Sequence, residues 1–449
     1  MVLSNFTNQS ATARLAAGIF FPQRPALGLD QRSYSPTVLD KIVSANAEHK
    51  SAYKAQKMLW KLGEVSISVS EIMDLSGMIG QELCEHLQQQ SLAHAEQRLE
   101  PQHPEPPRVA VVSVDGGRIM TREEGERGVH EQRWKETKNA CLLTMSSTPS
   151  DTDPHPELPA CFTNREYVEK LVREMHSSGS CGGKSEEIPA ISPETAAPSS
   201  VTVEPSKSSA NSRRQEKPWR PQRLMRTCIS SMVCSDDFGP IVAGEAQRRG
   251  FYQAEQKGFV GDGGTWNWTI HAAYFSDFVA ITDFVHPLGY LYDAAQLLSP
   301  DDPWPQYLRA TTACWQGRVA EVLSELRAWV ATHPTLANEK LSEDDPRSIV
   351  RETITYLANN EGRMDYPTYR RRGLPVSSFM IESLIKEINY RVKGTEKFWN
   401  RPQGAEQILQ IRAAALCDDD RLSRWILNRP GSHFYRRSTP QKHPLSVPA

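Results

Sequence analysis

The chain has 449 residues, of which 39% are hydrophobic, and a formal net charge of −2. Its length predicts two or three domains of roughly 100–200 residues each, and its near-neutral charge excludes nucleic-acid binding through overall charge alone. No apolar run reaches the roughly 20 residues that cross a bilayer, and the start MVLSNFTNQS lacks the pattern of a secretion signal. The eight cysteines form no C-x-x-C pair, which argues against a zinc ribbon or a disulfide framework. We therefore expect a reduced cytoplasmic protein that does not bind membranes.

Residues 1–105 are predicted to form an N-terminal helical region. Ser35-Pro36 is typical of a helix start, because proline suits the first helical turn. The stretch SVSEIMDLSGMIGQELCEHLQQQ then predicts two helices with a turn at Gly77. Such a pair is either a DNA-binding helix-turn-helix or an ordinary helical hairpin, and the sequence leaves both open.

The pattern changes to strands over residues 106–147. Three short strands in an antiparallel meander are predicted from RVAVVSVDGG, HEQRWKETKN and ACLLTMSS. Residues 148–222 form an insertion that is rich in Ser, Pro, Glu and Thr from residue 176 onward. Such a segment cannot bury enough apolar surface to offset the entropy of ordering it, so we expect it to be largely disordered there.

The second half of the chain alternates between strands and helices before it becomes helical. Residues 223–299 alternate in the way that marks an α/β layer. Residues 300–372 are predicted to be a helical insertion, in which apolar residues from Leu308 to Trp329 follow one face of a long helix. A further helix lies within 373–400, and 401–449 are predicted to be a basic C-terminal tail.

Two segments place Asp-Gly-Gly directly after a predicted strand, at Asp115 and at Asp262. Ligands bind at strand ends in α/β sheets, so the fold could bring these two carboxylates together. Together they could hold divalent cations, since Mg²⁺ favours hard oxygen ligands. Each segment alone is more typical of an ordinary turn.

A third carboxylate lies on the helix predicted from Met380 to Gly394. The apolar face of this helix carries Ile381, Ile385, Ile388 and Val392, and the opposite stripe carries Glu382, Lys386, Asn389 and Lys393. A carboxylate followed by cations suits a metal site that opens onto a phosphate backbone. Taken alone, such a stripe is more typical of a solvated face with an i,i+4 ion pair.

Two further features bear on function. Asp283 and His286 follow another predicted strand, although a lone histidine is more often structural than a ligand. Between Tyr366 and Ala449, Lys and Arg outnumber Asp and Glu by 15 to 7, and aromatic residues are interleaved with them. Cations neutralise phosphates and rings stack on bases, so this bias favours a nucleic-acid surface over a merely solvated one.

In chain order, several segments resemble a DDE-type insertion-sequence transposase of the bacterial, distantly Mutator-like kind. They are VDGG, RWKE, GDGGTWNW, TDFVH and YRRRGLPVSSFMIES…RVKGTEKFWN, and FFPQRPALGLD near the N-terminus is also similar. The resemblance covers most of residues 106–430. It implies an α/β fold, namely an RNase H-like mixed sheet with flanking helices, interrupted by an all-α insertion and preceded by the helical region.

The resemblance also implies roles for particular residues. Asp115, Asp262 and Glu382 correspond to the catalytic, metal-binding carboxylates, and Asp283 and His286 to an accessory (Cys/Asp)-x-x-His motif. A competing assignment makes Asp283 the second metal ligand and Asp262 the accessory residue. The three carboxylates would hold two Mg²⁺ ions about 3.5–4 Å apart, with Mn²⁺ as a substitute, for DNA cleavage and strand transfer.

The implied partners are the DNA of the element's terminal repeats and target DNA. The residues expected to bind DNA are Lys386, Asn389, Lys393, Lys397 and Trp399. A homo-oligomer on DNA and association with the nucleoid are also implied. Two alternatives remain, a transposase-derived DNA-binding protein without catalysis and an RNase H-like nuclease that cuts without joining. Related sequences often carry Gly-Ser-Gly where this chain has Ser377-Ser378-Phe379, which reflects either ordinary divergence or decay of an inactive copy.

Overall fold

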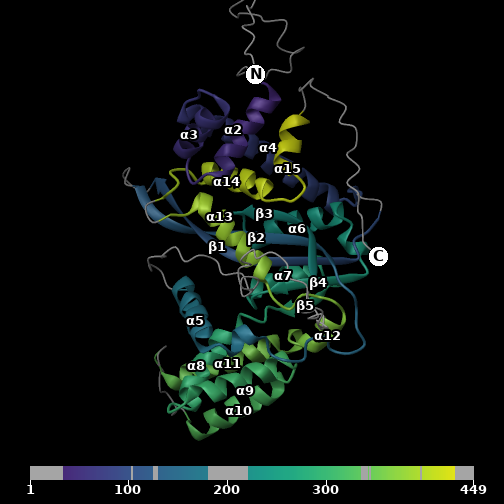
Figure 1. The fold of residues 1–449 in the computed structure, drawn as a ribbon, viewed down its shortest axis with the longest axis vertical. Helices are drawn as coiled ribbons and strands as arrows, with labels where there is room; N and C mark the ends of the chain where they lie inside the picture. Colours follow the sequence, from purple (N-terminus) through teal and green to yellow (C-terminus); the bar gives the residue numbers. More distant parts are fainter. Residues whose placement is uncertain are drawn as a thin grey trace, which may run out of the picture.

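The computed structural model describes residues 34–102, 105–124, 130–179, 221–334, 342, 345–394 and 397–429. Three predicted features lie outside these described residues, namely the segment FFPQRPALGLD, the Ser/Pro-rich part of the insertion over 180–220, and the end of the tail from 430 onward. Figure 1 shows the described residues as three stacked parts, with helices at one end, a sheet in the middle and more helices at the other end.

The middle part is a mixed five-stranded sheet. Its strands are β1 (Val109–Glu124), β2 (His130–Ser146), β3 (Gln222–Ser231), β4 (Gln256–Gly261) and β5 (Val279–Thr282). They lie in the order β3-β2-β1-β4-β5, with β2 antiparallel to both neighbours and β1, β4 and β5 parallel. This order, with helices packed on the sheet, confirms the predicted RNase H-like α/β fold.

The predicted meander of three short strands is wrong, because HEQRWKETKN and ACLLTMSS lie in the single strand β2 and the first strand is longer than predicted. β1 runs straight through the first Asp-Gly-Gly, so that Asp115 pairs with Asn139 of β2 and the chain does not turn there. A Cβ at Gly117 would lie 2.6 Å from Oγ1 of Thr137. Glycine is needed here because a neighbouring side chain comes close to the backbone. In the sequence alone, a glycine required for close approach looks the same as a glycine required for a turn.

The N-terminal helices are α2 (Pro36–Glu48), α3 (Ala52–Gly63) and α4 (Val69–Ala95). The predicted turn at Gly77 is wrong, because α4 continues through it. A Cβ at Gly80 would lie only 2.3 Å from the backbone oxygen of Gln407 in α14 (Pro402–Ala415). These helix glycines permit close packing of two helices, and the helix-turn-helix predicted for this segment is not formed.

The start of the predicted basic tail is folded. α14 and α15 (Arg421–Leu427) pack beside the N-terminal helices, so that the two ends of the described chain share one layer (Figure 1). The reason is a strongly apolar helix in which Ile408, Leu409 and Ile411 are buried. Hydrophobic burial therefore ties residues 402–427 to the body of the protein.

Each face of the sheet has its own core. Val109 and Val111 of β1 belong to one buried cluster with α13 (Phe379–Val392), whereas Ala110 and Val112 belong to a second. The helices that contact the strands are α13, α14, α6 (Ser235–Arg248) and α7 (Thr265–Tyr274), whereas α5 (Arg165–Gly179) packs against α8 (Pro287–Leu298). Among the described residues, no helix is both long and apolar enough to cross a membrane.

The helical insertion lies at the end of the molecule opposite the N-terminal helices. It contains α9 (Pro303–Trp315), α10 (Val319–Thr332), α11 (Pro346–Asn360) and α12 (Tyr366–Arg371). The single long helix predicted from Leu308 to Trp329 is two helices. Gly317 separates them with a φ of +72°, a left-handed conformation that favours glycine.

Candidate carboxylate site

The strand register brings three aspartates to one edge of the sheet. Ser113 of β1 pairs with Val260 of β4, so Asp115 and Asp262 both lie two residues beyond this pair. Gly261 of β4 pairs with Thr282 of β5, so Asp262 and Asp283 both lie one residue beyond that pair. Adjacent strands are about 4.8 Å apart, and the three aspartates therefore form a row across neighbouring strands.

The alternation of side chains along a strand directs this row toward one face. Val111, Val260 and Ile281 belong to the core cluster that includes α13. Each is separated from the aspartate on its strand by an even number of residues, so the aspartates are directed toward the same face. Glu382, in the first turn of α13, joins them there. We call Asp115, Asp262, Asp283 and Glu382 the carboxylate cluster.

Asp115 lies inside β1, at a point beyond the end of β4. The parallel pairing ends at Ser113, which leaves this side of β1 open to the cluster. The amide N–H of Gly116 donates to Oδ1 of Asp115 at 2.6 Å. At Gly117, the next residue along the strand, the side chains of Thr137 and Asn139 pack against the backbone of β1.

Asp262 follows β4 in a tight loop. Its Oδ1 accepts a hydrogen bond from the amide of Gly264 at 2.8 Å and another from the buried side chain of Asn267. Gly263 has a φ of +100°, and a Cβ there would lie 2.8 Å from the ring of Tyr356. The hydroxyl of Tyr356 in α11 also donates to the backbone oxygen of Asp262 at 3.0 Å. The helical insertion thus supports this loop directly.

Asp283 is the most buried member of the cluster, with 1% of its surface exposed. Its Oδ1 accepts hydrogen bonds from the amides of Val285 at 3.3 Å and Ser378 at 2.9 Å. His286 is half-buried directly before α8, and its ring lies 6.0 Å from the ring of Tyr356, the residue that contacts Asp262. Of the accessory pair, Asp283 therefore belongs to the cluster itself and His286 lies near it.

Ser378 is a site residue that sequence reasoning missed. Its hydroxyl donates to Oε1 of Glu382 at 3.2 Å, and its amide is bound to Asp283. Asn267 and Tyr356 were missed as well. The sequence signals were the departure Ser377-Ser378-Phe379 and the second Asp-Gly-Gly, but neither reveals which distant residue is contacted.

The electrostatics of the cluster are those of crowded like charges. Burial raises the pKa of the Asp115 carboxyl well above its usual range, and the negative charge of Asp262 raises it further. Burial also raises the pKa of Asp283 to about 6. The pKa of Glu382 is raised by burial first and then by the charge of Asp283, while Lys386 lowers it. The fold concentrates negative charge here with little compensation from cations.

The donor set fits divalent cations chemically. Mg²⁺ and Mn²⁺ prefer carboxylate oxygens, and a bound cation would neutralise buried like charges. Asp115, Asp262 and Glu382 could hold such ions, with Asp283 adjacent. In the ranges that the structure describes, no three acidic, His or Cys side chains are close enough to hold an ion as they stand. Binding therefore requires these side chains to rotate toward one another.

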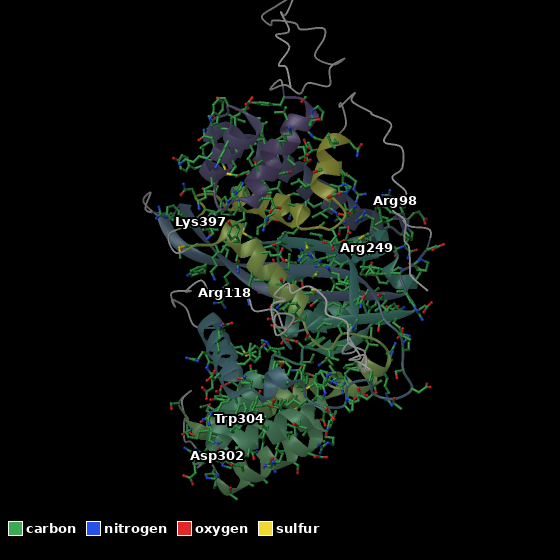
Figure 2. The ribbon with its side chains drawn as sticks, viewed as in Figure 1. Arg98, Arg118, Arg249, Asp302, Trp304 and Lys397 are labelled. Carbon is green, nitrogen blue, oxygen red and sulfur yellow. The ribbon has the colours of Figure 1, made fainter. Side chains whose placement is uncertain are left out.

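The residues expected to bind DNA fall into two groups. Lys386 and Lys393 are exposed along α13 and Asn389 is half-buried, so these three line a path leading away from Glu382. Lys397 and Trp399 are turned inward. The ammonium of Lys397 donates to the backbone oxygen of Lys50 at 2.7 Å, and Figure 2 shows it on the side toward the N-terminal helices.

The expectation that Trp399 stacks on DNA bases is not met by its position. Trp399 is 9% exposed, and its indole N–H donates to the backbone oxygen of Val392 at 3.0 Å. Several arginines of the same basic stretch are also buried, namely Arg370, Arg391 and Arg412. Part of the positive charge that favoured a nucleic-acid surface therefore has an internal, structural role.

Comparison with known proteins adds little. The sequence matches no protein-family model and no curated protein. Among solved structures it is similar to the Drosophila P element transposase strand transfer complex, at 10% identity and a TM-score of 0.33, over 88% of this chain and 94% of that one. A likeness this low leaves the strand order and the carboxylate geometry as the support for the fold and the site.

Proposed function

We propose that this protein is a DDE-type transposase that cleaves DNA and transfers the strands of its own insertion sequence in a metal-dependent reaction. Asp115, Asp262 and Glu382 would hold two Mg²⁺ ions, for which Mn²⁺ can substitute. The observation that carries the proposal is the row of aspartates on adjacent parallel strands, facing the first turn of α13 from the same side. An ordinary core does not bury four carboxylates together.

The residues around the cluster suit phosphoryl transfer. When bound, the two cations would neutralise the charge of the reacting phosphate and activate the attacking oxygen. The chain itself holds one oxygen of Asp115 with the Gly116 amide and one oxygen of Asp262 with Gly264 and Asn267. A nucleophilic Ser or Tyr is not required by this chemistry.

DNA is the proposed partner, as terminal repeats and as target. Lys386 and Lys393 are exposed on the same helix as Glu382, where they could neutralise phosphates next to the reacting one. A homo-oligomer on DNA and association with the nucleoid follow from the same proposal, because two ends of an element must be brought together.

Two alternatives are distinguished by the geometry and by experiment. A DNA-binding protein without catalysis is disfavoured, because all the carboxylates are retained and are held by specific hydrogen bonds. The departure at Ser377-Ser378-Phe379 supports divergence rather than decay, since Ser378 contacts two members of the cluster. A nuclease that cuts without joining would share this site, and only the reaction products separate it from a transposase.

The test is a strand-transfer assay with purified full-length protein, Mg²⁺ or Mn²⁺, and the DNA that flanks its own gene. We expect the unmodified protein to join 3′-hydroxyl ends to target DNA. Glu382→Gln should lower the rate of this reaction at least 100-fold, because removing a group that stabilises transition-state charge has an effect of about this size or larger. Glu352→Gln is the matched control, because Glu352 is exposed on α11. We expect this variant to be as active as the unmodified protein.

Each other outcome supports a different reading. Cleavage without joining would favour the nuclease. Specific DNA binding without cleavage in either metal would favour the non-catalytic protein. Equal activity in Glu382→Gln and Glu352→Gln would remove Glu382 from the site.

A further inference from the structure

Asp262 and Asp283 compete for the role of second metal ligand, and their surroundings differ. Asp262 is half-buried, and both donors to its Oδ1 lie within five residues of it, at Gly264 and Asn267. These bonds orient Asp262 within its own loop. Asp283 is 1% exposed and accepts a hydrogen bond from Ser378, which lies 95 residues further along the chain.

The bond from Ser378 joins the sheet to the helix that carries Glu382. Ser378 is the residue directly before α13. The first amide N–H groups of a helix have no partner within the helix, so a carboxylate that accepts a hydrogen bond at this point fixes where the helix begins. The amide of Asp283 in turn donates to the backbone oxygen of Gly261 at 2.8 Å. Asp283 is thus held on β4 and holds the start of α13.

The connection continues to the carboxylate of Glu382. The backbone oxygen of Ser378 accepts from the amides of Ile381 at 2.8 Å and Glu382 at 3.2 Å. The hydroxyl of Ser378 donates to Oε1 of Glu382 at 3.2 Å. An unbroken series of hydrogen bonds therefore runs from β4 through Asp283 and Ser378 to the side chain of Glu382.

We propose that Asp283 is a positioning residue, which fixes the first turn of α13 and thereby the Glu382 carboxylate through Ser378, and that Asp262 is the second metal ligand. The metal in this statement rests on the proposed function, whereas the positioning of the helix does not. To bind a metal through Oδ1, Asp283 would have to use an oxygen that already accepts two backbone hydrogen bonds. To bind through Oδ2, it would have to turn that oxygen toward the metal from a buried position.

The test compares three substitutions in the full-length protein. Asp283→Asn keeps an oxygen that can accept from the Ser378 amide, whereas Asp283→Ala removes the acceptor. Asp262→Asn is the matched change at the other aspartate. Two quantities are measured for each protein, the affinity for Mn²⁺ by calorimetry and the hydrogen exchange of the first turn of α13 by mass spectrometry. Exchange reports local opening whether or not a metal is bound.

We expect the two Asp283 variants to differ from each other. Asp283→Ala should speed exchange in the first turn of α13 and weaken Mn²⁺ binding about 10–100-fold, the usual effect of losing a group that orients a ligand. Asp283→Asn should leave exchange as in the unmodified protein and weaken Mn²⁺ binding less than about 10-fold, because the acceptor remains. Asp262→Asn should leave exchange unchanged and weaken Mn²⁺ binding at least as much as Asp283→Ala.

Two results would overturn the proposal. In the first, Asp283→Asn loses as much Mn²⁺ affinity as Asp262→Asn while the hydrogen exchange of Asp283→Asn is unchanged. This would show that Asp283 is a metal ligand. The other is unchanged exchange in Asp283→Ala. Should the unmodified protein bind no Mn²⁺, the proposed function fails, and the exchange data still decide whether Asp283 holds the helix.

A fourth variant, Ser378→Ala, tests the last link and does not depend on how well Asp283→Ala folds. It retains the amide bound to Asp283 and removes only the hydroxyl that contacts Glu382. We expect weaker Mn²⁺ binding with exchange as in the unmodified protein. Unchanged Mn²⁺ affinity in Ser378→Ala would show that the Ser378 hydroxyl does not position Glu382.

Discussion

Charged side chains are buried in opposite ways in two regions of this molecule, the junction of the helices at one end and the carboxylate cluster. At the junction of α6, α14 and α15 with the N-terminal helices, buried charges are paired with opposite ones. Glu245 is fully buried and accepts hydrogen bonds from Arg248 and Arg421. In the carboxylate cluster, buried groups of the same sign lie side by side.

The contrast is clearest in two carboxyls. Burial alone would raise the pKa of Glu245, but the charges of Arg421 and Arg248 outweigh it and lower the pKa to about 2. Burial raises the pKa of Asp115 as well, and there the neighbouring charge of Asp262 acts in the same direction. The buried charges of the junction are therefore compensated by opposite charges, whereas those of the cluster repel one another. Local instability of this kind is typical of functional sites.

The largest effect should come from breaking the paired region with Glu245→Gln. It leaves Arg248 and Arg421 buried without their carboxylate, which should lower the free energy of unfolding by about 3–5 kcal/mol at pH 7. The pKa of Glu245 is lower in the folded state, so its contribution is present above about pH 4.5 and is lost as the pH falls toward 2. Urea unfolding at pH 7 and pH 3 measures both. The difference in the free energy of unfolding between the variant and the unmodified protein should be smaller at pH 3 than at pH 7. If it is the same at both, the ion pairs of Glu245 are not its source.

The next largest effect tests how closely the paired region is packed. Gly80→Ala should lower the free energy of unfolding by about 1–3 kcal/mol, because the new Cβ would overlap the backbone of Gln407 and force α4 and α14 apart. Gly404→Ala on α14 is the matched control, since nothing lies within 4 Å of its Cβ position. That variant should be neutral or slightly stabilising. If Gly80→Ala and Gly404→Ala change the free energy of urea unfolding by the same amount, α4 and α14 can move apart without loss of stability.

Features set by local pattern could be predicted from the sequence. The alternation of strands and helices and the two Asp-Gly-Gly segments gave the α/β fold and located Asp115 and Asp262. The apolar face of α13 was also predicted, and Ile381, Ile388 and Val392 are buried as expected. These features depend on residues a few positions apart, where periodicity carries the information.

Features set by distant contacts could not be predicted. Gly77 and Gly117 look like turn residues until the neighbouring helix or strand is known. The inward orientation of Lys397 and Trp399 depends on carbonyl groups at Lys50 and Val392. The role of Ser378 is of the same kind, because its partner Asp283 comes from another part of the chain. A single sequence does not show which segments meet.

A smaller effect, of opposite sign, is expected in the carboxylate cluster. Asp115→Asn removes one of several repelling charges, so it should raise the free energy of unfolding of the metal-free protein by about 0.5–2 kcal/mol at pH 8. Added Mg²⁺ should then stabilise the unmodified protein more than the variant, because ligand binding favours the folded state. Urea unfolding in EDTA and in Mg²⁺ measures both terms. Destabilisation in EDTA would contradict the view that the cluster is uncompensated.

The last prediction concerns Lys397, a cation near the junction that lies beside Arg391 instead of a carboxylate. Burial and then the charge of Arg391 lower the pKa of Lys397 to about 7, from 10.5. Between these values the unfolded chain binds more protons than the folded one, so stability should rise with pH across this window, and the penalty should be full below pH 7. Lys397→Met removes this titration. In urea unfolding at pH 6.5 and 9, the stability of the unmodified protein relative to the variant should increase with pH, because only the unmodified protein sheds a buried charge. A constant difference would show that Lys397 is charged in the folded protein throughout this range, with the carbonyls of Lys50 and Arg391 sufficient to hold it.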